Sequence, residues 1–115
     1  MRKGELVRLR HMLDAAKEAL SFIKGKSRSD LDTNRMLVLS LVKDIEIIGE
    51  AASKVSAEVR AKNADIPWLD IIDMRNHLIH AYFDIDLDIV WDSVIRDLPP
   101  LIDTLGKIIS REGEK

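Results

Sequence analysis

Apolar residues recur at three- and four-residue spacing along the first half of this chain. In one stretch, about residues 5 to 24, they are Leu6, Leu9, Leu13, Ala16, Leu20 and Ile23. In a second, from residue 33 to about residue 61, they are Leu37, Leu41, Ile45, Ile48, Ala52, Val55 and Val59. This spacing gathers apolar side chains on one face of an α-helix, which has about 3.6 residues per turn. We therefore predict two long amphipathic helices, which must bury these faces against other helices.

Turn and capping residues divide the chain into helices. Those that mark the expected helix ends are Gly25, Asp32 or Thr33, Asp65, Pro67, Asp86 or Asp88, and the Pro99–Pro100 pair, which is expected to interrupt the last helix. With 5 Gly, 3 Pro and 4% aromatic residues, the chain lacks the turn signals and preferred residues of an all-β fold. We predict an all-α fold in which residues 1–115 form a single domain, an antiparallel bundle of four to five helices.

Small residues gather near the middle of the second long stretch. Gly49, Ala51 and Ala52 lie close together there. Glycine costs a helix about 1 kcal/mol relative to alanine, so its presence favours a packing reason such as the close approach of another backbone. Tight helix packing is predicted at this point.

The composition narrows the classes of function. The chain has no cysteine, which removes disulfides, thiolate nucleophiles and thiolate metal sites. With 18 basic and 20 acidic residues its formal net charge is -2, so nucleic-acid binding would need a local basic patch or an assembly. No apolar run approaches the ~20 residues that cross a bilayer, and the N-terminal segment does not resemble a secretory signal. A cytoplasmic protein is expected.

The segment "MRNHLIHAYFDIDLD", residues 74–88, concentrates the residues with chemical potential. On a helix starting near Trp68, the residues expected along one stripe are Trp68, Ile72, Arg75, Ile79 and Tyr82, with His77 on the opposite face. Arg75 interrupts this apolar stripe, so it is expected beside a carboxylate, at a wet interface or in a site. Asn76 and His80 are four residues apart, so the amide can orient the imidazole.

Arg75 and His80 differ by about 140° around a helix that turns ~100° per residue, so one helix does not aim both at one atom. Two copies of the helix facing each other would bring Arg and His from both chains into a shared cleft. These groups permit cleavage of RNA, in which His80 moves a proton, Arg75 binds the phosphate and the substrate's 2′-OH attacks without a metal.

Two other interpretations of the same residues remain open. In one, Arg75 pairs with an acidic residue and His80 merely caps a helix C-terminus. In the other, His77 and His80 bind a metal, although the sequence offers no third ligand at suitable spacing.

The run "RNHLIHAY" resembles the R-x4-H-x-Y motif of HepT-type proteins in the HEPN superfamily, and "IEIIGEAASKV" and "DLPPLID" resemble the family's long helix and final turn. The resemblance implies a dimeric HEPN-like bundle. It also implies a metal-independent endoribonuclease toxin that needs no cofactor. Its partner in a type VII-like toxin-antitoxin pair would be an MntA-like minimal nucleotidyltransferase.

The resemblance also implies a role for each motif residue. Arg75 and His80 would be catalytic, Asn76 would position them, and Tyr82 would be the acceptor of AMPylation. The alternative is a non-catalytic HEPN module that binds, and is modified by, a nucleotidyltransferase partner.

Overall fold

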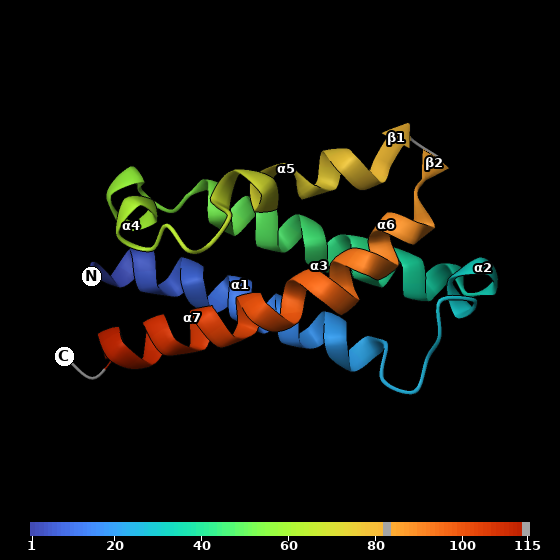
Figure 1. The fold of residues 1–115 in the computed structure, drawn as a ribbon, viewed down its shortest axis with the longest axis horizontal. Coiled ribbons are helices and arrows are strands. Elements are labelled where there is room, and N and C mark those ends of the chain that lie inside the picture. The colour runs from blue at the N-terminus through green and yellow to red at the C-terminus, as the bar shows by residue number, and fades with distance from the viewer. Residues whose placement is uncertain (82–83, 114–115) are drawn as a thin grey trace.

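The computed structural model of the protein describes residues 1–81 and 84–113, without the side chains of residues 79–81. Its elements are α1 (Lys3–Phe22), α2 (Asp30–Thr33), α3 (Arg35–Ser53), α4 (Ala57–Lys62), α5 (Trp68–Leu78), β1 (Ile79–Ala81), β2 (Asp84–Ile85), α6 (Leu87–Asp92), the π-helical turn η1 (Ser93–Asp97) and α7 (Leu98–Gly113). Helices α1, α3, α5 and the α6–η1–α7 run alternate in direction, and the start of α1 and the end of α7 lie at one end of the bundle (Figure 1). The predicted all-α bundle is confirmed, with one short β1–β2 hairpin at the far end.

A single apolar core lies between these helices. The largest side chains with no more than 1% exposure are Leu9, Met12, Leu41, Ile45, Ile48, Leu78, Leu98 and Leu105. Most of the apolar positions predicted from the spacing on α1 and α3 belong to this core, because both helices turn those faces inward. Among the described residues, no helix combines the length and apolar character needed to cross a membrane.

The second long helix is shorter than predicted. Helix α3 ends at Ser53, and α4 begins after Ser56, whose hydroxyl accepts a hydrogen bond from the Val59 N–H at 3.2 Å. The guanidinium of Arg60 then donates to the carbonyl oxygens of Ala52, Ser53 and Val55 at distances of 2.9 to 3.3 Å. These bonds satisfy carbonyl groups that the end of α3 leaves open, so the chain can break the helix and still continue its apolar pattern into α4.

The prolines do not end the last helix. Pro99 and Pro100 lie in the first turn of α7, which continues α6 through the π-helical turn η1. The N–H of Leu98 donates to the carbonyl oxygen of Ser93, five residues back rather than four. The wider turn accommodates two residues that lack an N–H and whose rings would collide with a regular helix, which is why the predicted interruption is absent.

One of the predicted helix caps is confirmed and one is wrong. Asp86 caps α6, because its carboxylate accepts from the Ile89 N–H at 3.1 Å. Helix α3 is capped by Asn34, which accepts from the Leu37 N–H at 3.0 Å. Asp32 and Thr33, the predicted caps, belong instead to the short helix α2.

The predicted tight packing is confirmed at Gly49, where α3 crosses α5. A Cβ atom at this position would lie 3.3 Å from the carbonyl oxygen of Ile71 and 3.4 Å from that of Ile72. Both neighbours are backbone atoms, so they can retreat only if the helices move apart. The close approach of the two backbones therefore favours glycine at this position.

Gly49→Val should destabilise the fold by about 1–3 kcal/mol, the usual cost of forcing extra atoms into a packed contact. Gly106→Val is the matched control, because in the described part of the chain no atom beyond the adjoining turns of its own helix lies within 4 Å of a Cβ built at Gly106. Urea unfolding followed by circular dichroism measures both. Equal stability of the two variants would contradict the close approach.

Asp44 is a buried carboxyl group on α3. The residue is only 2% exposed, and its Oδ2 atom has no hydrogen-bond partner among the described residues. Burial, aided by a hydrogen bond and the negative charge of Glu18 on α1, raises the pKa of Asp44 from 3.8 to about 7. The folded protein therefore holds a proton that the unfolded chain releases at lower pH.

This proton makes the stability fall as pH rises from about 4 to about 7, because in that window the folded state binds more protons than the unfolded state. The contribution of one group is at most about 1.4 kcal/mol per pH unit. Asp44→Asn, which mimics the protonated form at every pH, should flatten the decline. Urea unfolding across this pH range checks it, and parallel curves for parent and variant would contradict it.

Candidate functional site

Arg75 lies in the last turns of α5 with its side chain 58% exposed. Its Nε atom is 3.3 Å from a carboxylate oxygen of Glu46 on α3. Of the settings predicted for this arginine, the one beside a carboxylate is therefore present. An exposed pair of this kind contributes about 0–1 kcal/mol, so a phosphate can draw the guanidinium away at little cost.

The buried face of α5 differs from the apolar stripe predicted from the sequence. The residues that α5 buries are Trp68, Ile71, Met74 and Leu78, whereas Ile72 is half-buried and Arg75 is exposed. The prediction placed Arg75 on the buried face because Trp68, Ile72 and Arg75 also have helical spacing. In the structure, Arg75 instead lies at the edge of the buried face of α5, next to Glu46 of α3.

Arg75 and Asn76 open on a groove of about 650 Å³. It is lined by Arg8 and His11 of α1, by Lys43, Glu46, Ile47, Gly49, Glu50, Ala51 and Ser53 of α3, by Lys54, and by Ile72, Arg75 and Asn76 of α5. This basic groove carries four cationic side chains against two carboxylates, so its charge is +2 even with His11 neutral. The chain as a whole carries -2. The local patch that nucleic-acid binding requires is therefore present beside Arg75.

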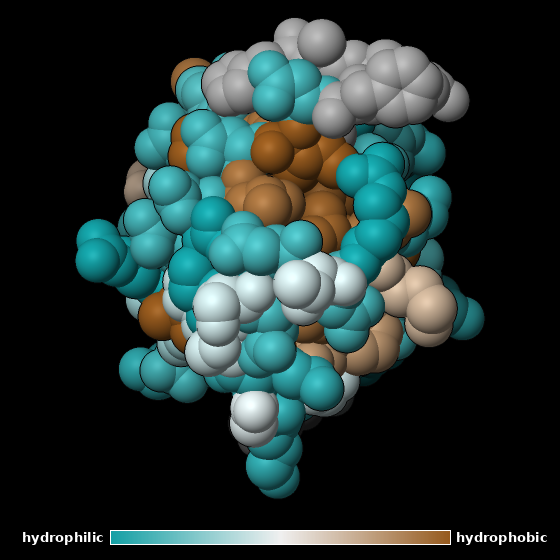
Figure 2. Space-filling model, turned by 90° about the vertical axis from the view of Figure 1, so that its right-hand side faces the viewer, coloured by the Kyte–Doolittle hydropathy of each residue, from teal (hydrophilic) through white to brown (hydrophobic). Residues whose placement is uncertain are grey.

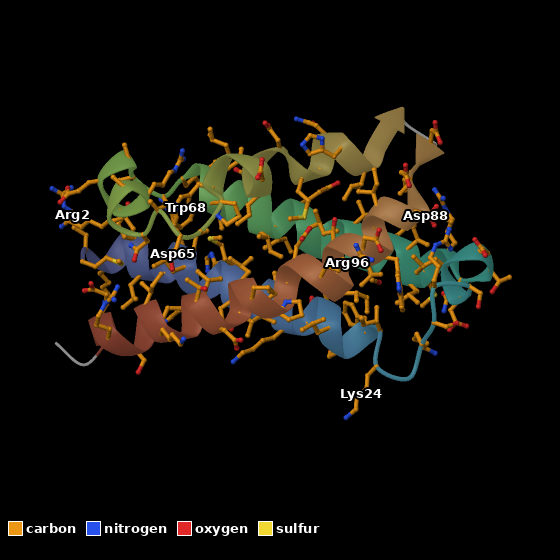
Figure 3. All side chains as sticks on the ribbon, in the orientation of Figure 1. Arg2, Lys24, Asp65, Trp68, Asp88 and Arg96 are labelled. Atoms are coloured by element: carbon orange, nitrogen blue, oxygen red, sulfur yellow. The ribbon has the colours of Figure 1, made fainter. Side chains whose placement is uncertain are left out.

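A second groove, of about 470 Å³, lies on the other flank of α5, between that helix and the α6–η1–α7 run. Its ionisable residues are Asp65, Asp70, His77, Arg96 and Asp97, which give a charge of -2 with the histidine neutral. Asp65 and Arg96 are labelled in Figure 3, on the chain before α5 and on η1. Burial, and then the charge of Asp92, raises the pKa of Asp97. His77 faces this acidic groove, away from the groove of Arg75, as predicted.

Helix α5 ends before it reaches His80. The carbonyl oxygen of Leu78 accepts from the Asp86 N–H at 2.7 Å, and residues 79–81 continue as a strand opposite β2. A longer helix would need that carbonyl for its own next turn. The expected 140° between Arg75 and His80, and the helical pairing of Asn76 with His80, therefore do not apply. The side chain of His80, and Tyr82 as a whole, lie outside the described residues.

The end of the bundle that carries the hairpin has an apolar surface. Figure 2 looks at this end and shows hydrophobic side chains gathered in its middle, framed by hydrophilic ones. In the elements that reach this end, Met36 is exposed and Ile85 and Leu87 are half-buried. At the same end, Arg28 forms ion pairs with Asp88 at 2.7 Å and with Asp32 at 3.0 Å.

The site thus offers an exposed arginine and amide on one wall of a cationic groove, which is suited to binding a phosphate. The sequence analysis missed Arg8, His11 and Lys43, which line the same groove from other helices. Arg8 and His11 are one turn apart on the polar side of α1, but no sequence signal connects them with residues 75 and 76. Among the side chains that the structure describes, no group of three or more His, Asp or Glu residues is placed to hold a metal.

Comparison with known proteins finds one family and several relatives. A profile of the family described as "Ribonuclease HepT-like" matches residues 12–108. A protein of Caldanaerobacter subterraneus named "Putative RNase" is 33% identical over 104 residues, which cover 90% of this chain and 93% of that protein. "Probable ribonuclease HepT" of Thermococcus cleftensis is 31% identical over 93 residues, covering 77% of this chain and 84% of the relative.

A longer relative matches over part of its length. The Methanocaldococcus jannaschii protein named "Gamma-glutamylcyclotransferase and putative RNase" is 36% identical over 109 residues, which cover 95% of this chain and 49% of that protein. No solved structure matches the chain significantly. The family assignment therefore rests on sequence, and the fold on the structure described above.

Proposed function

The chain belongs to the HepT-like ribonuclease family, and from that premise we propose that it is a metal-independent endoribonuclease toxin. The observation that carries the proposal is Arg75, exposed and only loosely paired with Glu46 on the wall of a groove with a charge of +2. Such a group binds the phosphate of an RNA backbone and stabilises the negative charge that builds on it during cleavage.

In the proposed reaction the 2′-OH of RNA attacks the adjacent phosphorus. His80 takes the proton from that hydroxyl, the bond from phosphorus to the 5′ oxygen breaks, and the leaving oxygen receives a proton. The products are a 2′,3′-cyclic phosphate and a 5′-OH end. Arg75 neutralises the phosphate, and Asn76 keeps the groups in position. A cleft formed by two copies supplies one histidine to remove the first proton and another to deliver the second.

The exposed start of α3, at the hairpin end of the bundle, supports an assembly of two copies. Met36 and Leu39 are 80% and 47% exposed, and they lie one turn apart on this helix. Covering these residues with a second copy would remove apolar surface from water and bring the second motif towards the first.

His80→Ala should abolish RNA cleavage, since loss of a positioned acid-base group lowers the rate by ~10²- to 10⁴-fold. Arg75→Ala should abolish it as well, because it removes the group that binds the phosphate and stabilises its charge. The circular dichroism should keep its helical form. His77→Ala is the matched control and should retain activity, because His77 faces the acidic groove. Gel assays on defined RNAs measure all three.

Equal loss of cleavage in the three variants would contradict these roles.

Cleavage should persist in EDTA and leave a cyclic phosphate, so inactivation by chelation and recovery with a divalent metal would contradict the metal-independent mechanism. Light scattering that shows a monomer at micromolar concentration would argue against the shared cleft. A parent protein without activity would favour the alternative, a non-catalytic module that binds a nucleotidyltransferase.

We further propose that this toxin acts in the cytoplasm and pairs, as in type VII systems, with a minimal nucleotidyltransferase antitoxin. The antitoxin would transfer AMP from ATP to the hydroxyl of Tyr82, forming a bond from that oxygen to phosphorus and releasing pyrophosphate. Tyr82 is the single tyrosine of the sequence and lies seven residues after Arg75. An added nucleotide carries a bulky anion into the motif, where it would oppose the substrate phosphate by charge and by volume.

Incubation with the cognate nucleotidyltransferase and ATP should add one AMP to the parent chain and silence it. Tyr82→Phe removes the acceptor oxygen, so it should gain no mass and stay active. Intact-mass spectrometry paired with the cleavage assay measures both effects. A mass gain in Tyr82→Phe, or its full silencing by the active partner, would exclude this tyrosine as the switch.

A further inference from the structure

The wall of the basic groove opposite Arg75 is formed by α1 and the outer face of α3. Arg8 and His11 lie one turn apart on α1, and Lys43 lies on α3 one turn before Glu46. Within the described part of the chain, none of these three side chains makes an ion pair or a side-chain hydrogen bond. Two cationic groups and an imidazole therefore line the groove without a partner among the described side chains.

The carboxylates of the same groove are already paired. Glu46 lies 3.3 Å from Arg75, and Glu50 lies 3.2 Å from Lys54, the residue that follows α3. The net charge of +2 therefore resides on Arg8 and Lys43, away from the motif residues. The flank of α5 that carries His77 has a charge of -2 and would repel a polyanion. An RNA strand held by Arg75 is thus directed across α3 towards α1.

We propose that Arg8 and Lys43 bind the phosphates of single-stranded RNA next to the phosphate held by Arg75, so that the strand crosses α5, α3 and α1 along the basic groove. This inference rests on the proposed ribonuclease function and deepens it by naming residues that hold the substrate. Because these contacts go to phosphates, they add affinity without selecting a base sequence.

Binding is measured with a fluorescent single-stranded RNA of random sequence whose riboses are 2′-O-methylated, so that no free 2′-OH is present for cleavage. Arg8→Ala and Lys43→Ala are each compared with a matched control. Arg10→Ala removes an exposed arginine of α1 that does not line the groove. Lys24→Ala removes a lysine that points into solvent near the end of α1 (Figure 3).

Each groove variant should weaken binding roughly five-fold at about 0.1 M salt, and should reduce the slope of log affinity against log salt by about 0.7, as loss of one phosphate contact to a single strand requires. The controls should match the parent in affinity and slope. A purely structural role would not change the salt slope, and circular dichroism shows whether each variant is folded.

Three results would overturn the inference while leaving the ribonuclease function standing. The first is equal weakening of RNA binding by all four variants, and the second is no weakening by the groove variants. The third is that the groove variants lose binding to the nucleotidyltransferase while their RNA binding stays intact, which would make the groove a protein interface. A parent chain that binds no RNA and cleaves none would instead refute the proposed function, and this inference with it.

Discussion

The contact between the backbones of α3 and α5 at Gly49 sets the geometry on which the site depends. Because Gly49 has no Cβ, the two helices approach so closely that a Cβ built there would lie 3.3 Å and 3.4 Å from the carbonyl oxygens of Ile71 and Ile72. They run in opposite directions, so one turn further along α5 and one turn back along α3 bring Arg75 next to Glu46. The arginine is therefore held at the helix edge, exposed but oriented.

The same contact divides the charge of the surface. Helix α5 presents Arg75 and Asn76 to a groove with a charge of +2, and Asp70 and His77 to a groove with a charge of -2. A chain with a net charge of -2 can thus attract a polyanion on one flank only. Adjacent residues of one helix, Asn76 and His77, face opposite electrostatic environments, which accounts for the different roles assigned to two polar neighbours.

The β1–β2 hairpin, rather than helix α5, contains the backbone of His80, the residue proposed to transfer the proton. Helix α5 ends at Leu78 because the Leu78 carbonyl bonds to Asp86, and Asp86 also caps α6. The backbone of His80 consequently lies in β1, between the paired residues Ile79 and Ala81 where the pairing with β2 is irregular, rather than in the helix that carries Arg75. The sequence suggests one continuous helix from Arg75 to His80, but the structure places Arg75 in α5 and His80 in β1, so their spacing does not fix the angle between their side chains.

The sequence by itself determined the helical bundle, the inward faces of α1 and α3, the close packing at Gly49 and the motif that contains Arg75, because spacing and small residues are local properties of the chain. It did not determine the break between α3 and α4, where Arg60 satisfies open carbonyls, or the continuous helix through Pro99 and Pro100, because both depend on local hydrogen bonds that override propensity. Only the tertiary structure placed Arg8 and Lys43 in the groove of Arg75. Residues on three helices become neighbours through packing, and no spacing within one segment encodes that distance.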